Sequence, residues 1–129
     1  MQPAYFLNVD LEIQSASNLD SLSKAMGRRV YVLHSGPGSA GRNLVALEIS
    51  RDVKGPDATI HALCAVVEDL PRAARRIWNA AIKEFDVGYE LRASEFNSRF
   101  SLRPDTLKRI AKLGATLTVT YYRGDANEP

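Results

Sequence analysis

The stretch from Tyr5 to Gln14 alternates between apolar and polar residues, and no other feature of the sequence constrains the fold as strongly. The odd positions carry apolar or aromatic side chains, Tyr5, Leu7, Val9, Leu11 and Ile13. The even positions from 8 onward carry polar ones, Asn8, Asp10, Glu12 and Gln14. Successive side chains of a strand point to opposite faces, so this pattern predicts a strand with one buried and one wet face. Parallel sheets are usually covered on both faces, and the wet face therefore favours an antiparallel or mixed sheet.

The rest of the chain predicts further strands and helices in a regular succession. Helices are predicted over residues 19–26, 57–70, 71–85 and 104–113. Strands are predicted over residues 29–34, 43–50, 87–91, 96–102 and 116–122. The order β-α-β-β-α-α-β-β-α-β fits an α+β fold with one mostly antiparallel sheet of about six strands and helices packed on one face. We expect a single domain over residues 1–122 and a polar C-terminal tail over residues 123–129.

The helical spacing also predicts which side chains form the core. In the helix that follows Pro71, we expect Trp78, Ile82 and Phe85 to face inward, and Lys83 to face outward with the arginines of the same helix. Five residues are expected to be nearly fully buried, namely Leu11, Ile77, Trp78, Leu107 and Val119.

Composition limits the class of protein. The 129 residues include 45% hydrophobic and 25% charged residues, which is typical of a globular domain and argues against disorder. The formal net charge of +2 is too small to indicate nucleic-acid binding. The single cysteine, Cys64, excludes an intrachain disulfide and favours a reducing compartment. Since no signal peptide or membrane-spanning run is visible, we expect a cytoplasmic protein without a membrane partner.

A glycine-rich segment over residues 35–42 contains Gly36, Gly38 and Gly41, which match the G-x-G-x-x-G spacing of dinucleotide sites. Such a site needs a helix directly after the glycines, whose N-terminus faces the pyrophosphate. Here the residues after Gly41 predict a strand, so we interpret the segment as a mobile hairpin loop. A small-ligand-binding or enzymatic domain that uses this loop or the open sheet face remains the alternative function.

Other candidate chemistry is sparse, and the sequence indicates no catalytic residue, cofactor or metal. His61 and Cys64 are three residues apart on a predicted helix and could approach one metal ion, but no spacing supplies further ligands. His34 and Ser35 are adjacent on a strand and therefore point to opposite faces, unlike members of a catalytic triad. Basic residues on two helices could form a phosphate-binding patch if those helices were neighbours, namely Arg72, Arg75, Arg76, Lys83, Lys108, Arg109 and Lys112. Interspersed acidic residues dilute this patch, and nucleic acid is not the expected partner.

The wet face of the sheet is the surface most suited to binding. It is expected to carry mainly carboxylates, threonines and a tyrosine, with Arg92 and Arg99 toward one side; the other residues are Asn8, Asp10, Glu12, Glu48, Glu90, Thr116, Thr118, Thr120 and Tyr122. Short carboxylates on strands are held rigidly, and tyrosine recurs at protein interfaces. We predict that a partner protein contacts Asp10, Glu12, Glu90 and Tyr122. The sequence leaves the oligomeric state open.

The C-terminal half of the chain resembles a family of small bacterial domains of unknown function. The resemblance lies in the stretch from Phe100 to Leu117, with its Leu113-Gly114-Ala115 turn, and in the closing Tyr121-Tyr122, and it covers about half of the chain. Some members of this family stand beside contact-dependent toxins and are regarded as immunity proteins. The resemblance therefore implies a non-enzymatic protein-binding domain, an immunity-type inhibitor of a bacterial toxin, with the toxin as its partner.

Overall fold

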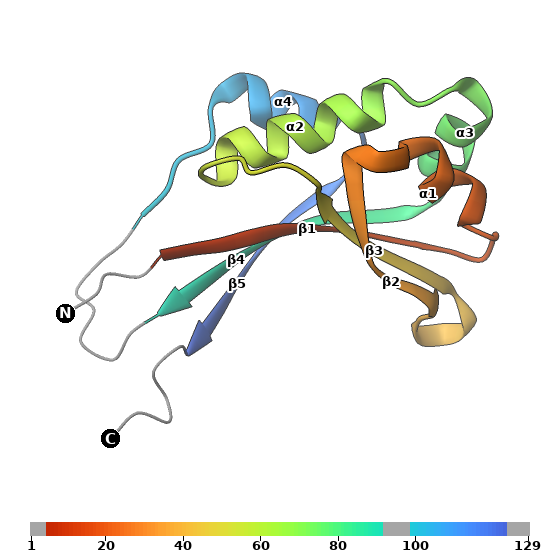
Figure 1. The fold of residues 1–129 in the computed structure, drawn as a ribbon, viewed down its shortest axis with the longest axis horizontal. Helices are drawn as coiled ribbons and strands as arrows, with labels where there is room; N and C mark the ends of the chain where they lie inside the picture. Colours follow the sequence, from red (N-terminus) through yellow and green to blue (C-terminus); the bar gives the residue numbers. More distant parts are fainter. Residues whose placement is uncertain (1–4, 92–98, 124–129) are drawn as a thin grey trace.

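Five strands form one open sheet in the order β2-β3-β1-β4-β5 (Figure 1). The computed structural model describes residues 5–91 and 99–123. The strands are β1 (Tyr5–Ser15), β2 (Val30–Pro37), β3 (Asn43–Ile49), β4 (Ile82–Leu91) and β5 (Thr116–Arg123). Neighbouring strands are antiparallel from β2 through β3 and β1 to β4, whereas β5 runs parallel to β4. The sheet is therefore mixed, with antiparallel pairing dominant.

In the described part of the chain, four helices cover one face of this sheet and no helix covers the other, which we call the uncovered face (Figure 1). They are α1 (Asp20–Met26), α2 (Pro56–Glu68), α3 (Arg72–Ala80) and α4 (Pro104–Lys112), with short 3-10 turns η1 (Gly27–Arg29) and η2 (Ser39–Gly41). α1 packs beside α3, and α2 packs beside α4 and over β1 and β3. None of the helices in the described part of the chain is both long and apolar enough to cross a membrane.

The expected α+β class and the placement of the helices on one face are confirmed, but the number of strands and their order are not. A strand was expected over residues 96–102; residues 96–98 lie outside the described ranges, and residues 99–103 form no strand. β4 is therefore followed by α4 and then β5 in the described chain. A helix between two neighbouring strands is the usual connection of a parallel pair, which explains why β4 and β5 run in the same direction.

The boundary between α3 and β4 also differs from the expectation. α3 ends at Ala80, and Ile82 already begins β4. Ile82 is consequently 52% exposed rather than buried, whereas Lys83 is only 7% exposed. Because residue 83 pairs with the core residue Ile13 of β1, its side chain lies on the covered face of the sheet.

The core lies between the covered sheet face and the helices. Leu11 and Trp78 are fully buried as expected, whereas Ile77 and Val119 are only partly buried. Leu107 is 48% exposed, so its predicted burial is wrong. The buried residues of α4 are instead Thr106 and Ile110, which are four positions apart, and Leu113 is buried directly after the helix.

The alternation of β1 is interrupted close to its start. The register with β4 shifts between Phe6 and Asn8, which leaves Leu7 as the extra residue of a bulge. Phe6 consequently packs against the core, while Leu7 is 43% exposed. From Val9 to Ile13 the alternation holds as expected, with the odd residues buried.

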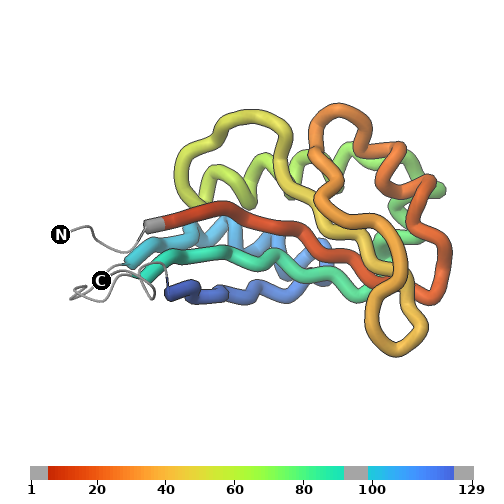
Figure 2. The backbone as a smooth tube through the Cα atoms, turned by 60° about the horizontal axis from the view of Figure 1, so that its bottom comes forward, coloured from red at the N-terminus to blue at the C-terminus, as the bar shows by residue number. Residues whose placement is uncertain are grey.

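The glycine-rich segment is shorter and more regular than expected. Gly36 and Pro37 belong to β2, and η2 closes the turn before β3 begins at Asn43, as the tube in Figure 2 shows. Two backbone hydrogen bonds close this turn, from the Gly38 amide to the Arg42 carbonyl and from the Arg42 amide to the Ser39 carbonyl. The strand expected after Gly41 is therefore present, and no helix N-terminus stands where a pyrophosphate would need one.

Candidate functional site

The uncovered face of the sheet carries an unusual concentration of carboxylates. β1 contributes Asp10 and Glu12 to this face, and β4 contributes Glu84 and Asp86. The register pairs Asp10 with Asp86 and Glu12 with Glu84. The Cβ atoms of directly opposed residues lie about 5 Å apart in an antiparallel pair, so like charges meet twice in succession.

A fifth carboxylate approaches from the other side of β1. The pairing of β1 with β3 runs up to Leu11 and Leu47, and the next residues on the uncovered face are Asp10 and Glu48. Glu48 is the strongest charged neighbour of Asp10, ahead of Glu12 and Asp86. We call the set Asp10, Glu12, Glu48, Glu84 and Asp86 the carboxylate cluster.

Only neutral groups donate hydrogen bonds to this cluster in the described chain. The Asn8 amide donates to Asp10 (3.0 Å), the Thr120 hydroxyl donates to Asp86 (2.7 Å), and the Thr118 hydroxyl donates to Glu84. Within residues 5–91 and 99–123, no lysine or arginine forms an ion pair with any of the five carboxylates. The negative charge of the cluster is therefore not neutralised by the described part of the chain.

Crowding and burial perturb the carboxyl groups of β1. The pKa of Asp10 rises from 3.8 to about 6, first because the side chain is half-buried, and then through repulsion by Glu48, Glu12 and Asp86. The pKa of Glu12 is also raised, by burial and then by Glu84 and Asp86. The raised pKa values mean that ionisation of Asp10 and Glu12 lowers the stability of the folded protein.

The raised pKa of Asp10 leads to a prediction about stability. The folded protein binds more protons than the unfolded chain between pH 3.8 and about 6, so Asp10 weakens folding as the pH rises through this window. Asp10→Asn removes this titration without changing the shape of the side chain. We expect the variant to be more stable than the parent by about 1 kcal/mol at neutral pH, allowing for solvent screening, and the difference to vanish near pH 4.

Urea denaturation of both proteins at the two pH values measures this difference. Asp20→Asn, at an exposed position of α1, is the matched control and should not stabilise the protein. An Asp10→Asn protein that is less stable than the parent at neutral pH would contradict the repulsion.

The structure places all four predicted contact residues on the uncovered face, but in two groups. Asp10 and Glu12 belong to the carboxylate cluster, while Glu90 and Tyr122 pair with each other further along β4 and β5. Gly88 separates the two groups. A Cβ at position 88 would lie 2.8 Å from the Asn8 side-chain oxygen and 3.5 Å from the Tyr122 ring, so glycine lets both side chains lie flat over β4.

Two members of the cluster, Glu84 and Asp86, were missed by the sequence reasoning. The helix expected over residues 71–85 includes Glu84, and the following strand was expected to begin only at Val87, after Asp86. The alternation of Phe85, Val87 and Tyr89 with acidic residues or glycine does continue back to position 84, and this signal could have identified both residues.

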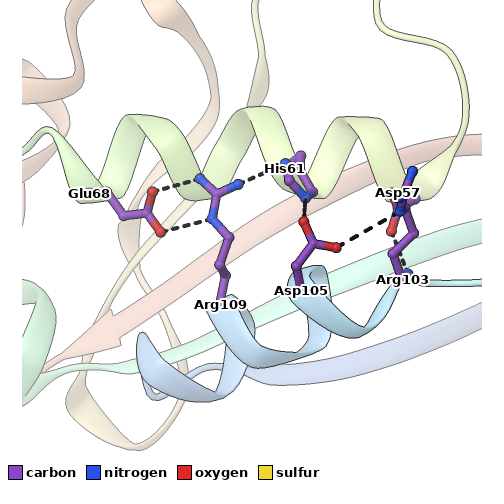
Figure 3. A network of polar contacts seen from close by, with 6 residues as sticks. All are labelled: Asp57, His61, Glu68, Arg103, Asp105 and Arg109. Carbon is purple, nitrogen blue, oxygen red and sulfur yellow. Dashed lines mark hydrogen bonds and ion pairs between the residues drawn. The ribbon is translucent and has the colours of Figure 1, made fainter.

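A second polar constellation joins α2 to α4 (Figure 3). The Arg109 guanidinium forms two hydrogen bonds with Glu68 (2.6 and 2.9 Å) and donates a third to His61 Nδ1 (2.7 Å). His61 Nε2 lies 3.1 Å from Asp105, and the Asp57 carboxylate accepts the Arg103 amide at the start of α4. The guanidinium lowers the pKa of Glu68, chiefly through the hydrogen bonds. Each charged group in this network already has a partner, which is typical of contacts that hold two helices together. We call these six residues, the ones labelled in Figure 3, the α2–α4 staple.

The hollow beside this staple has a volume of about 650 Å³ and is open to solvent. Two arginines, Arg51 and Arg103, and three alanines, Ala58, Ala62 and Ala65, form part of its lining. Its volume would admit a small molecule. However, Arg109 and His61 already bind Glu68 and Asp105, so few free polar groups converge on it.

The other sites that the sequence suggested are not assembled in the described residues. His61 uses both ring nitrogens within the α2–α4 staple, whereas Cys64 is fully buried and burial raises the pKa of its thiol to about 11. In the described ranges, no group of three or more His, Cys, Asp or Glu side chains could hold a metal ion. Beside the glycine-rich turn, the hollow lined by Ser35 and Gly36 measures only about 60 Å³, too small for a nucleotide.

Two of the basic residues that could have formed a phosphate-binding patch are already engaged elsewhere. Lys83 is buried on the sheet and Arg109 is bound to Glu68, so neither is free to contact phosphate.

Comparison of the chain with protein-family models, with curated proteins and with solved structures gave no significant match.

Proposed function

We propose that this chain is a non-enzymatic protein-binding domain whose uncovered sheet face docks onto a basic surface of another protein. The observation that carries this proposal is the carboxylate cluster, since five acidic side chains share one face without a cationic partner in the described residues. Repulsion between them costs folding stability, and a cationic partner surface would relieve it.

The distribution of charge supports a directed encounter. With Glu90, six of the chain's fifteen acidic residues lie on one face of the sheet, although the whole chain carries a formal charge of +2. The rest of the molecule is therefore net positive. Such a charge separation orients a basic partner toward the sheet and repels it from the helices.

The sheet also provides a rigid and partly apolar surface. Strand side chains lose little freedom on binding because the ladder already holds their backbone. Tyr122, which is 51% exposed, adds aromatic area at the end of the same face. An immunity-type inhibitor is the narrower form of this proposal, because the substrate cleft of a nuclease toxin is basic and would match the cluster.

Calorimetric titration with the product of the adjacent gene tests the proposal. We expect saturable binding that the double change Asp10→Lys, Glu12→Lys weakens by at least about tenfold, because two attractions become repulsions. Binding should also weaken as salt concentration rises.

The matched control reverses the same number of charges on the helical layer, with Asp20→Lys and Asp69→Lys. If both double variants weaken binding equally, the sheet face does not carry the contact. If the parent does not bind the adjacent gene product, the immunity-type form of the proposal is wrong.

A further inference from the structure

Asp10 is the most crowded member of the carboxylate cluster. It faces charged side chains on both flanking strands and on its own strand, because β1 lies in the middle of the sheet. The titratable groups around it are Glu48 of β3, Asp86 and Glu84 of β4, and Glu12 of β1. The helices lie on the opposite side of the sheet, so they place no charge over Asp10 (Figure 1).

Neutral donors reach three of the five carboxylates in the cluster, with one hydrogen bond to each. β5 places a threonine hydroxyl against both β4 members of the carboxylate cluster, namely Thr118 against Glu84 and Thr120 against Asp86. On β1, Asn8 donates one amide hydrogen bond to Asp10. Hydrogen bonds to an ionised carboxylate favour its charged form, but Asp10, Glu84 and Asp86 receive one each. The central position of Asp10, with Glu48 on one flanking strand and Asp86 on the other, is therefore what favours a proton at this residue.

We propose that in mildly acidic solution the free protein retains a proton on the carboxylate cluster, mainly at Asp10, and that a cationic partner expels this proton on docking, so that binding strengthens as the solution becomes less acidic. This inference rests on the proposed function, because it concerns the same face and the same class of partner. Its chemistry is a simple exchange: the carboxyl O–H bond breaks, the proton passes to solvent, and a lysine or arginine side chain takes its place beside the carboxylate.

The direction of the pH dependence follows from this exchange. The bound state carries fewer protons than the free state, so mass action favours the complex when protons are scarce. Below the midpoint of Asp10, which lies near pH 6, affinity should rise by up to about tenfold per pH unit. Above this midpoint it should become nearly constant, because the free protein has already lost the proton.

A titration of the free protein tests the retained proton without any partner. Carbon-13 NMR of the side-chain carboxyl groups of the full chain should give Asp10 a midpoint near pH 6. Glu48→Gln should lower this midpoint, because it removes the strongest charged neighbour, whereas Asp20→Asn should leave it unchanged. A midpoint for Asp10 within the ordinary range of exposed aspartates would overturn the inference.

Calorimetry with a short oligolysine peptide tests the expulsion. Titrations near pH 6 in buffers of different ionisation enthalpy should show release of about half a proton per complex by the parent, because about half of the Asp10 side chains are protonated there, and markedly less by Asp10→Asn. Binding without proton release would overturn the exchange while leaving the docking face intact. If oligolysine does not bind at all, the proposed cationic partner and the coupling of binding to proton release are both wrong. The NMR midpoint of Asp10 still decides whether the free protein retains the proton.

Discussion

Replacement of Trp78 with alanine is expected to lower the free energy of unfolding by about 3–5 kcal/mol, the usual cost of removing a large aromatic side chain from a core. Trp78 is fully buried and links three elements. It belongs to α3, its indole N–H donates to the Leu113 carbonyl at the end of α4 (3.0 Å), and its ring lies 5.5 Å from the Lys83 ammonium of β4. Alanine would leave a cavity between these elements and remove a donor from the buried carbonyl.

Chemical denaturation of three variants separates these contributions. Trp78→Phe keeps most of the ring but loses the N–H donor, and it should cost an intermediate amount of about 1–2 kcal/mol. Leu107→Ala is the control in α4 and should cost less than about 1 kcal/mol, because Leu107 is 48% exposed. If Leu107→Ala were as costly as Trp78→Ala, the orientation of α4 described above would be wrong.

Replacement of Lys83 with alanine should cost about 2–4 kcal/mol, a large effect for a lysine. The Lys83 ammonium donates to the carbonyls of Trp78 (3.0 Å) and Asn79 (3.2 Å), which lie in the last turn of α3. A cation at this end of a helix also interacts favourably with the helix dipole. Burial, followed by repulsion from Arg75, lowers the pKa of Lys83, so the hydrogen bonds are what keep this ammonium in place.

A comparison of two substitutions divides the effect between the charge and the carbon stem. Lys83→Met keeps the buried stem and loses the donors, so it should be less destabilising than Lys83→Ala. Lys108→Ala, at an exposed position of α4, should change stability by no more than about 0.5 kcal/mol. Thermal unfolding measures all three, and equal stability of Lys83→Ala and Lys108→Ala would contradict the capping of α3 by Lys83.

Local patterns in the chain were sufficient for much of the fold. The alternation around Leu11 identified β1 and the face that it buries, because side chains two residues apart in a strand share one environment. Gly27 ends α1 with a φ of 62°, a backbone conformation that glycine adopts without steric cost. Pro104 begins α4, where the missing amide hydrogen is not needed.

The candidate face was predicted only in part. Asp10 and Glu12 could be assigned to a wet face because the pattern of β1 is strict. Their opposition to Asp86 and Glu84 could not be read from β1, because the partner strand and its register depend on contacts between residues more than seventy positions apart. The crowding that perturbs Asp10 is a product of this register.

The sequence by itself determined the period of β1 from Val9 onward, and with it which residues of that strand face the core. Only the tertiary structure decided where α3 ends and β4 begins, and that β5 pairs with β4 in the parallel direction. It also decided that Lys83 is buried while Leu107 is exposed. The physical reason is that hydrophobicity sets a local preference, whereas burial depends on which neighbours cover a side chain. Lys83 is stable inside because its ammonium group donates hydrogen bonds to two helix carbonyls, and those carbonyls reach it only once α3 and β4 are packed together.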